Sequence, residues 1–130
     1  MARGARTMSY ALKFEPNYPE YCNIYDRMFC HTLIREILDS GFSVTVHDGE
    51  DYCLMESKDF TEILESMSQS GEDFIIPCDS AIGRDEGWFH LIYDNGSERE
   101  PMICMTDMSA NPICEAIDNR VQRILEEQEL

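Results

Sequence analysis

Two short turn signals, each following an apolar run, constrain the fold of this chain most strongly. Asp48-Gly49 follows the alternating run 42–47, and Asp94-Asn95-Gly96 follows the apolar run 88–93. Such dipeptides favour tight β-hairpins, because Gly and Asn adopt the positive φ angles that two-residue type I′ turns require. We therefore predict that neighbouring strands are joined by short turns, as in an antiparallel sheet.

The remaining segments show helical or strand periodicity. A helix is predicted over 21–40 and another from Asn111-Pro112. Between them, a helix is predicted for which Ser57 and Asp59 both offer an N-cap, and Asp59 stands at capping-box spacing from Glu62. Strands are predicted over 42–47, 51–56, 74–78, 88–93 and 101–105. Pro77 indicates a sheet edge or the end of its strand, and the continuous run 88–93 indicates a central strand.

The predicted order is α-β-β-α-β-β-β-α. It defines an α+β domain with an antiparallel sheet of about five strands and helices packed on it. We expect residues 14–130 to form this single domain. Residues 1–13 form a basic leader without acidic residues, which we expect to be disordered or partly non-native, with Met8 as an alternative start.

The chain is strongly acidic. Its 26 Asp and Glu residues stand against 10 Lys and Arg residues, a net charge of −16. Three basic residues precede residue 14, so seven remain against 26 acidic ones, a net of −19 for the predicted domain. This charge repels nucleic acid and anionic membranes and attracts basic protein surfaces. The 43% hydrophobic content, with 6 Phe and 6 Tyr, argues against a disordered acidic tail.

Cysteine and histidine residues give no catalytic or metal-binding pattern. The six Cys contain no C-x-x-C pair, and with no secretory signal or membrane span we expect reduced thiols and a cytoplasmic protein. Cys30 and His31 point about 100° apart on a helix, which does not suit a zinc site with Cys22. His47 and His90 are interpreted as ordinary sheet residues. We expect no catalytic residue, no metal and no cofactor.

About the last two thirds of the chain resembles a pattern found in small uncharacterised phage and prophage proteins. Those proteins have a G-W-x-x-L-V-Y-x-N-x-G strand-turn before a V-I-S-D-Y-S-x-N segment, and an upstream V-x-D-G-E hairpin similar to residues 46–50 here. The matching residues are Gly87, Trp88, Leu91, Tyr93, Asn95, Gly96, Ile103, Asp107, Ser109 and Asn111. Met108 departs from the pattern, which usually has an aromatic residue there. The resemblance implies a phage or prophage origin and an α+β fold, and it implies no activity.

Acidic residues cluster at the predicted connections between elements. They are Asp48, Glu50, Asp51, Glu72, Asp73, Asp85, Glu86, Asp94, Glu98 and Glu100. Turn positions keep carboxylates outward, where their fields add toward a basic target. The leading hypothesis is a non-enzymatic phage-type protein that binds a basic, nucleic-acid-binding host protein. An inhibitor of a nuclease-based defence system, such as an anti-CRISPR or a DNA mimic, is its concrete form. We expect this protein to bind neither nucleic acid nor membrane directly.

Two alternatives come from other classes of protein. In the first, the acidity serves only solubility, and the chain is a homodimeric assembly module. Its contact would be Ile24 and Met28, which lie off the main apolar stripe of the first predicted helix and cover a second contact, either within the domain or with a partner. Thr32 lies on the side of the helix opposite to that stripe, where we expect it to face solvent. In the second, paired carboxylates bind a metal ion for hydrolysis.

Overall fold

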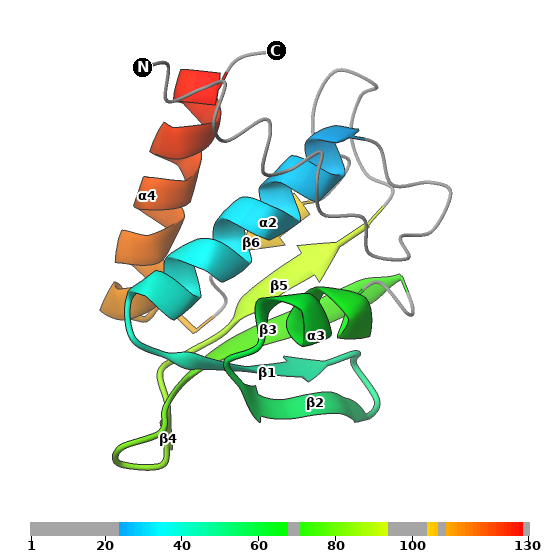
Figure 1. Ribbon diagram of the computed structural model, residues 1–130, viewed down its shortest axis with the longest axis vertical. Helices are drawn as coiled ribbons and strands as arrows, with labels where there is room; N and C mark the ends of the chain where they lie inside the picture. The colour runs from blue at the N-terminus through cyan, green and yellow to red at the C-terminus, as the bar shows by residue number, and fades with distance from the viewer. Residues whose placement is uncertain (1–23, 68–70, 94–103, 107–108, 129–130) are drawn as a thin grey trace.

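The fold is an antiparallel sheet with helices on one face (Figure 1). The computed structural model describes residues 24–67, 71–93, 104–106 and 109–128. Within them, the elements are α2 (Ile24–Asp39), β1 (Ser43–His47), β2 (Tyr52–Ser57), α3 (Phe60–Ser66), β3 (Glu72–Asp79), β4 (Arg84–Asp85), β5 (Phe89–Ile92), β6 (Cys104–Thr106) and α4 (Pro112–Gln128). The strands are arranged in the order β2-β1-β3-β5-β6, and β4 pairs with β3.

The predicted fold class and element order are confirmed. Every strand pair is antiparallel, and β5 lies between β3 and β6, as predicted for a central strand. One short strand that was not predicted, β4, is also present, and in it Asp85 pairs with Cys78 of β3.

The first hairpin differs in its turn from the predicted two-residue type I′ turn. His47 pairs with Tyr52, so four residues separate the strands. The Asp48 carboxylate closes this loop by accepting from the backbone N–H groups of Glu50 and Asp51, both at 2.8 Å. These donors, that of Asp51 foremost, hold the pKa of the Asp48 carboxyl below its ordinary value. The second predicted hairpin, at 94–96, lies outside the described residues.

Pro77 lies near the end of β3, and β3 is an interior strand rather than an edge. Pairing with β5 ends at Ile75, and pairing with β4 begins at Cys78. The Pro77 carbonyl accepts from the Glu86 N–H at 2.8 Å on the β4 side. Pro77 therefore stands between the part of β3 that pairs with β5 and the part that pairs with β4. Its missing N–H removes no hydrogen bond from either pairing.

Both predicted helix N-caps are present. Asp59 caps α3 and accepts from the Glu62 N–H at 3.0 Å. Glu62 completes the box indirectly: its carboxylate accepts from the Ser57 hydroxyl, which accepts from the Asp59 N–H. Asn111 caps α4 by accepting from the Ile113 N–H at 2.8 Å. These local signals begin the helices at the predicted residues.

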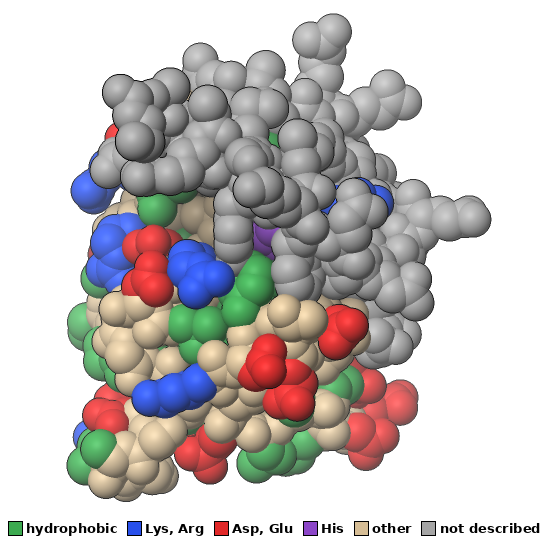
Figure 2. Space-filling model, in the orientation of Figure 1, with side chains coloured by type: hydrophobic (Ala, Val, Ile, Leu, Met, Phe, Trp, Pro, Cys, Tyr) green, Lys and Arg blue, Asp and Glu red, His purple; other side chains and the backbone are tan. Residues whose placement is uncertain are grey.

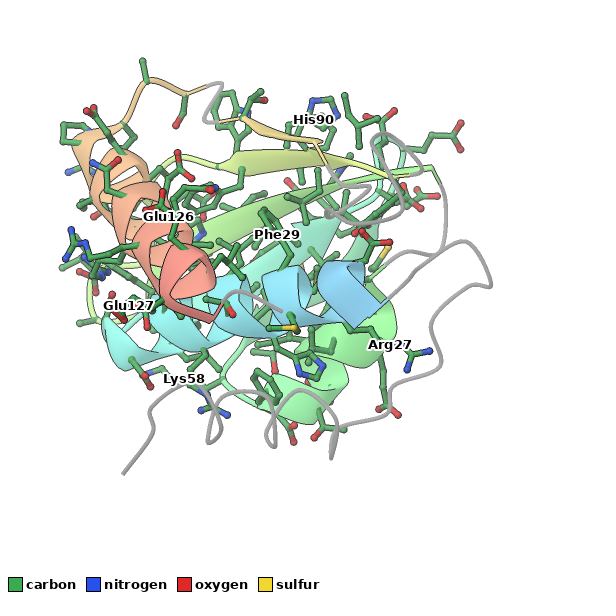
Figure 3. The ribbon with its side chains drawn as sticks, turned by 90° about the horizontal axis from the view of Figure 1, so that it is seen from above. Arg27, Phe29, Lys58, His90, Glu126 and Glu127 are labelled. Atoms are coloured by element: carbon green, nitrogen blue, oxygen red, sulfur yellow. The ribbon has the colours of Figure 1, made fainter. Side chains whose placement is uncertain are left out.

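The core lies between the sheet and the helices α2, α3 and α4. Apolar side chains from both layers fill it: Phe29, Leu33, Ile34, Ile37, Val44, Val46, Ile63, Leu64, Ile75, Phe89, Leu91, Ile117 and Val121. Phe29 points from α2 toward the sheet (Figure 3). On the surface of this layer, Arg120 of α4 donates to Glu36 at 3.0 Å and to Ser40 at 2.7 Å, which joins α4 to α2.

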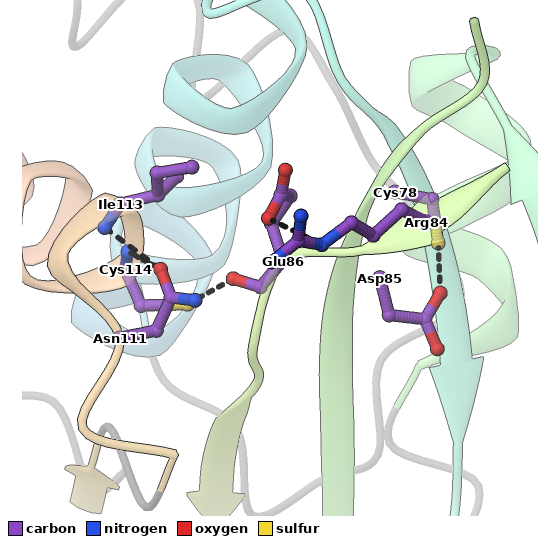
Figure 4. A network of polar contacts seen from close by, with 7 residues as sticks. All are labelled: Cys78, Arg84, Asp85, Glu86, Asn111, Ile113 and Cys114. Atoms are coloured by element: carbon purple, nitrogen blue, oxygen red, sulfur yellow. Dashed lines mark hydrogen bonds and ion pairs between the residues drawn. The ribbon is translucent and has the colours of Figure 1, made fainter. Parts of the chain in front are cut away.

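A close backbone approach holds the start of α4 against the segment before β5 (Figure 4). The Cys114 thiol donates to the Glu86 carbonyl, and the Trp88 N–H donates to the Ser109 hydroxyl, both at 3.3 Å. A Cβ atom on Gly87 would lie 2.5 Å from Ser109 Oγ and 2.7 Å from Asn111 Cβ. Gly87 also has a φ of +97°, so its lack of a side chain meets two requirements at once.

Replacing Gly87 tests this junction against a control with the same backbone conformation. Gly41 has a φ of +94°, and no described atom lies within 4 Å of the position that a Cβ would take there. We expect Gly41→Ala to cost about 1–2 kcal/mol from the left-handed backbone alone. Gly87→Ala should cost about 1–3 kcal/mol more because of the steric overlap. Urea unfolding measures both, and equal losses would contradict the close approach.

Candidate functional site

One row of side chains crosses the sheet on the face opposite to the helices. Tyr52 pairs with His47, His47 with Phe74, Phe74 with His90, and His90 with Thr106. Directly opposed residues of antiparallel strands point to the same face, so these five side chains lie side by side. We call them the outer row, and the sheet face that carries them the outer face. His90 lies on this side of the sheet, away from Phe29 (Figure 3).

The rings of the outer row are in continuous contact. The centroids of His47 and Tyr52 lie 4.7 Å apart in an edge-to-face arrangement, and those of His47 and Phe74 lie 6.2 Å apart. Phe74 and His90 are stacked, with centroids 4.3 Å apart and planes inclined by 3°. Such pairs contribute about 0.5–1.5 kcal/mol each. The rings therefore form a firm platform rather than independent surface side chains.

Exposed apolar side chains extend this platform. Tyr52 is 60% exposed, Trp88 38% and Ile92 39%. Ile92 stands two residues after His90 in β5, so strand alternation places it on the outer face. We infer the same face for Trp88, which directly precedes β5 and its buried first residue, Phe89. Within the described part of the chain, the helices lie on the other face (Figure 1). The outer face thus presents large apolar side chains to solvent.

Both histidines of the outer row have defined polar contacts. The Gly49 N–H donates to His47 Nδ1 at 3.0 Å. His90 Nε2 lies 2.8 Å from Glu72 Oε1. The Glu72 carboxyl carbon in turn lies 3.4 Å from the position a Cβ would take on Gly49. Glu72 therefore links the row to the β1–β2 hairpin.

This hairpin and Glu72 bring predicted acidic residues together at one end of the sheet. We call Asp48, Glu50, Asp51 and Glu72 the acidic end. Glu50 and Asp51 are exposed, and Asp48 and Glu72 are partly exposed. The negative charge lies directly beside the rings of His47 and His90, so the outer face combines an apolar platform with carboxylates.

The other predicted acidic residues are not part of this group. Asp85 and Glu86 lie at the opposite end of β3, since Asp85 pairs with Cys78, six residues along the strand from Glu72 and about 20 Å away. Asp94, Glu98 and Glu100 lie outside the described residues. The predicted acidic turn surface is thus two separate groups among the described residues.

Asp73 is a correction to the predicted acidic surface. It is fully buried, because strand alternation turns it to the helix face between the outward-facing Glu72 and Phe74. Its carboxylate accepts from the Tyr93 hydroxyl, which is also buried. A buried carboxylate needs such a donor, so Asp73 serves the interior and not a partner surface.

The predicted dimer contact is also not available on the surface, because Met28 is buried. Residues 28–34 are all buried, including Met28 and Thr32, so two turns of α2 have no solvent-facing side. The expectation that Thr32 faces solvent is wrong, and of the two expected uses of Met28 the contact within the domain is the one found, since α2 contacts α3, α4 and β1. Met28 is therefore not on the described surface, and the side chain of Ile24 lies outside the described residues.

Basic residues of the described chain are concentrated away from the outer face. Arg27 and Arg35 lie in α2, Arg120 and Arg123 in α4, and Lys58 just before α3. The helix side shows Lys and Arg beside acidic side chains (Figure 2), and Arg27 and Lys58 lie on the side away from His90 (Figure 3). Arg84, in β4, pairs loosely with Glu86 at 3.7 Å. The described Lys and Arg side chains therefore lie mainly on the helix side, where they are mixed with acidic ones.

The Cys78 thiol is bound within the fold. It is one of four free cysteines among the described side chains, with Cys30, Cys53 and Cys114. The Cys78 thiol donates to Asp85 Oδ1 at 3.1 Å (Figure 4), and its pKa is raised to about 11, mainly by burial. A thiol of this kind stays protonated near neutral pH and is a poor nucleophile.

Neither a metal site nor a membrane span occurs in the described residues. No group of three or more His, Cys, Asp or Glu side chains there is arranged to hold a metal ion. None of the helices in that part of the chain has both the length and the apolar character needed to cross a bilayer.

Comparison of the chain with protein-family models, with curated proteins and with solved structures found no match. The geometry of the outer face is therefore the basis on which a function is assigned.

The outer row was not evident from the sequence. His47 and His90 were interpreted there as ordinary sheet residues, and Tyr52 and Phe74 only as strand formers. The available signal was an aromatic or imidazole ring in each of four strands. Only the cross-strand register shows that these rings are neighbours.

The third histidine, His31, is a core residue. It packs edge-on against the Phe60 ring at 5.5 Å, and Arg35 lies over the same ring at 4.3 Å. Burial foremost, with the charges of Arg27 and Arg35, lowers its pKa to about 4. His31 is therefore neutral at physiological pH, which fits packing against Phe60.

The lowered pKa of His31 predicts a loss of stability in mild acid. The unfolded chain takes up a proton below the ordinary pKa of 6.5, whereas the folded chain does so only near 4. Stability is therefore complete above pH 6.5 and falls between 6.5 and about 4. From about pH 7 to about pH 5, the wild type should lose about 2 kcal/mol relative to His31→Leu. Urea unfolding at each pH measures this difference.

Thr32→Val is the matched control for that measurement. Thr32 is a buried neighbour without a titrating group, so this variant should keep the pH dependence of the wild type. Parallel curves for the wild type and His31→Leu would show that His31 is not held neutral in the fold.

Proposed function

We propose that this protein is a non-enzymatic binding protein that docks a basic protein on its outer face. The observation that carries the proposal is the ring platform of the outer row beside the acidic end, with basic residues of the described chain gathered on the helix side. The partner class is a basic, nucleic-acid-binding host protein. Inhibition of a nuclease-based defence system, as by an anti-CRISPR or a DNA mimic, is the specific form of this proposal.

The two parts of the outer face have different tasks in this proposal. Tyr52 and Trp88 supply apolar area of the kind that dominates affinity in protein interfaces. The carboxylates of the acidic end accelerate association with a positive surface and orient it, and this contribution weakens as salt screens it. The same carboxylates repel phosphate groups, which disfavours nucleic acid as the ligand despite the exposed rings.

Neutralising two acidic-end residues tests the proposal. The partner is first captured from an extract of the source organism, identified and purified. Glu50→Gln with Asp51→Asn should weaken its binding about tenfold at low salt, because two carboxylates beside the platform are lost. The wild-type affinity should also fall as salt rises to about 0.15 M. Isothermal titration calorimetry measures both effects.

Glu126→Gln with Glu127→Gln is the matched control. It changes the net charge by the same amount at the end of α4, on the helix side (Figure 3). It should weaken binding much less than the acidic-end variant. Equal effects of the two double variants would show that only overall charge matters. An acidic partner, or salt-independent binding, would overturn the proposal.

A homodimeric assembly module is the second candidate function, and the edge strand β2 favours it. Among the described residues, β2 pairs only with β1, and it carries exposed Tyr52 and Met55. An exposed edge with apolar side chains can pair with a second copy. If so, light scattering should show a dimer for the wild type and a monomer for Met55→Lys. A monomeric wild type would exclude this candidate.

A further inference from the structure

We propose that the outer row selects arginine over lysine in the partner, and that an arginine-rich segment is what the face binds. This inference rests on the proposed function, since it specifies the chemistry of the basic partner. The inference rests on the position of the acidic end directly beside the aromatic rings of the outer row.

A guanidinium group has two binding requirements, and the outer face meets both. Its flat faces stack on aromatic rings, and its N–H groups point outward in the plane toward carboxylate oxygens. Tyr52, exposed at one end of the row, offers a ring to solvent. The exposed carboxylates of Glu50 and Asp51 belong to the loop that connects the strands of Tyr52 and His47. A stacked guanidinium there has carboxylates within reach of its edge.

The chain itself contains the arrangement that we infer for the complex. The Arg35 guanidinium carbon lies 4.3 Å from the centroid of the Phe60 ring on the helix side. Arg120 shows the second type of contact, the hydrogen bond in the plane of the guanidinium, since it donates to the Glu36 carboxylate and the Ser40 hydroxyl. The outer face offers ring and carboxylate together, so a partner arginine makes both contacts at one place.

Lysine gains less from the same surface. Its ammonium group is a compact, strongly hydrated charge, and it does not stack on a ring. The carboxylates attract both cations, although only the guanidinium can pair with them through two parallel N–H groups. The rings add the stacked contact, and the Tyr52 variants measure that part of the discrimination. One stacked contact at an exposed site corresponds to about a fivefold difference in affinity.

Matched oligo-arginine and oligo-lysine peptides of equal length and charge test this inference on the full chain. Trp88 is the single Trp of the chain, is 38% exposed and lies on the outer face, so its fluorescence reports binding there. We expect the arginine peptide to bind about five- to tenfold more tightly than the lysine peptide. Both affinities should fall with added salt.

Variants at Tyr52 test whether the preference for arginine over lysine comes from the outer row. Tyr52→Ala and Tyr52→Leu should both lower this preference about fivefold, and Tyr52→Leu shows whether apolar area alone is sufficient. The control is Ile82→Ala, which truncates a side chain 63% exposed, comparable to Tyr52 at 60%, in the turn between β3 and β4. Ile82→Ala should leave the arginine preference unchanged. Circular dichroism confirms that each variant is folded.

The outcomes separate the two proposals. Equal, salt-dependent binding of both peptides overturns arginine selection and leaves the basic-partner proposal standing. An arginine preference that is undiminished in both Tyr52 variants overturns the assignment to the row. Absence of binding by either peptide overturns both proposals. Tighter binding of a single-stranded oligonucleotide than of either peptide also overturns both, because the face would then be a nucleic-acid platform.

Discussion

Side-chain alternation along β3 is the constraint on which both faces of this molecule depend. β3 pairs with β1, β4 and β5, so its register fixes the position of every central strand. Ile75 points into the core while Phe74 points to the outer face. A shift by one residue would exchange these two and expose the core side chain. The buried hydrogen bond from the Tyr93 hydroxyl to the Asp73 carboxylate also favours this register, because a shifted strand would leave the carboxylate without this donor.

Local signals explain how much of the fold was predictable. The N-caps Asp59 and Asn111 and the apolar periodicities act within a few residues, and the structure has the expected helices and strands. The turn after His47 was harder to predict. A two-residue turn and a four-residue loop closed by the Asp48 carboxylate fit the same sequence, and the second formed. Pro77 was misleading in a similar way, because its missing N–H falls between two pairing partners in an interior strand.

The candidate site was less predictable because it depends on register between distant segments. Glu72 and Asp73 are adjacent and chemically alike, yet one joins the acidic end and the other is buried. Likewise, His47, Phe74 and His90 come from three strands and become neighbours only through cross-strand pairing. The burial of Met28 required knowledge that α2 is enclosed by both the sheet and its neighbouring helices. Each of these facts is a property of the assembled sheet rather than of a local sequence.

The one-sided placement of the helices has a consequence for how this protein can change. Core packing involves the helix face of the sheet, while Tyr52, Trp88 and Ile92 stand on the other side of the same strands. Substitutions on the outer face alter what it contacts without repacking the interior. The composition of the outer surface and the packing of the interior are thus nearly independent in this chain, so the one can change while the other stays constant.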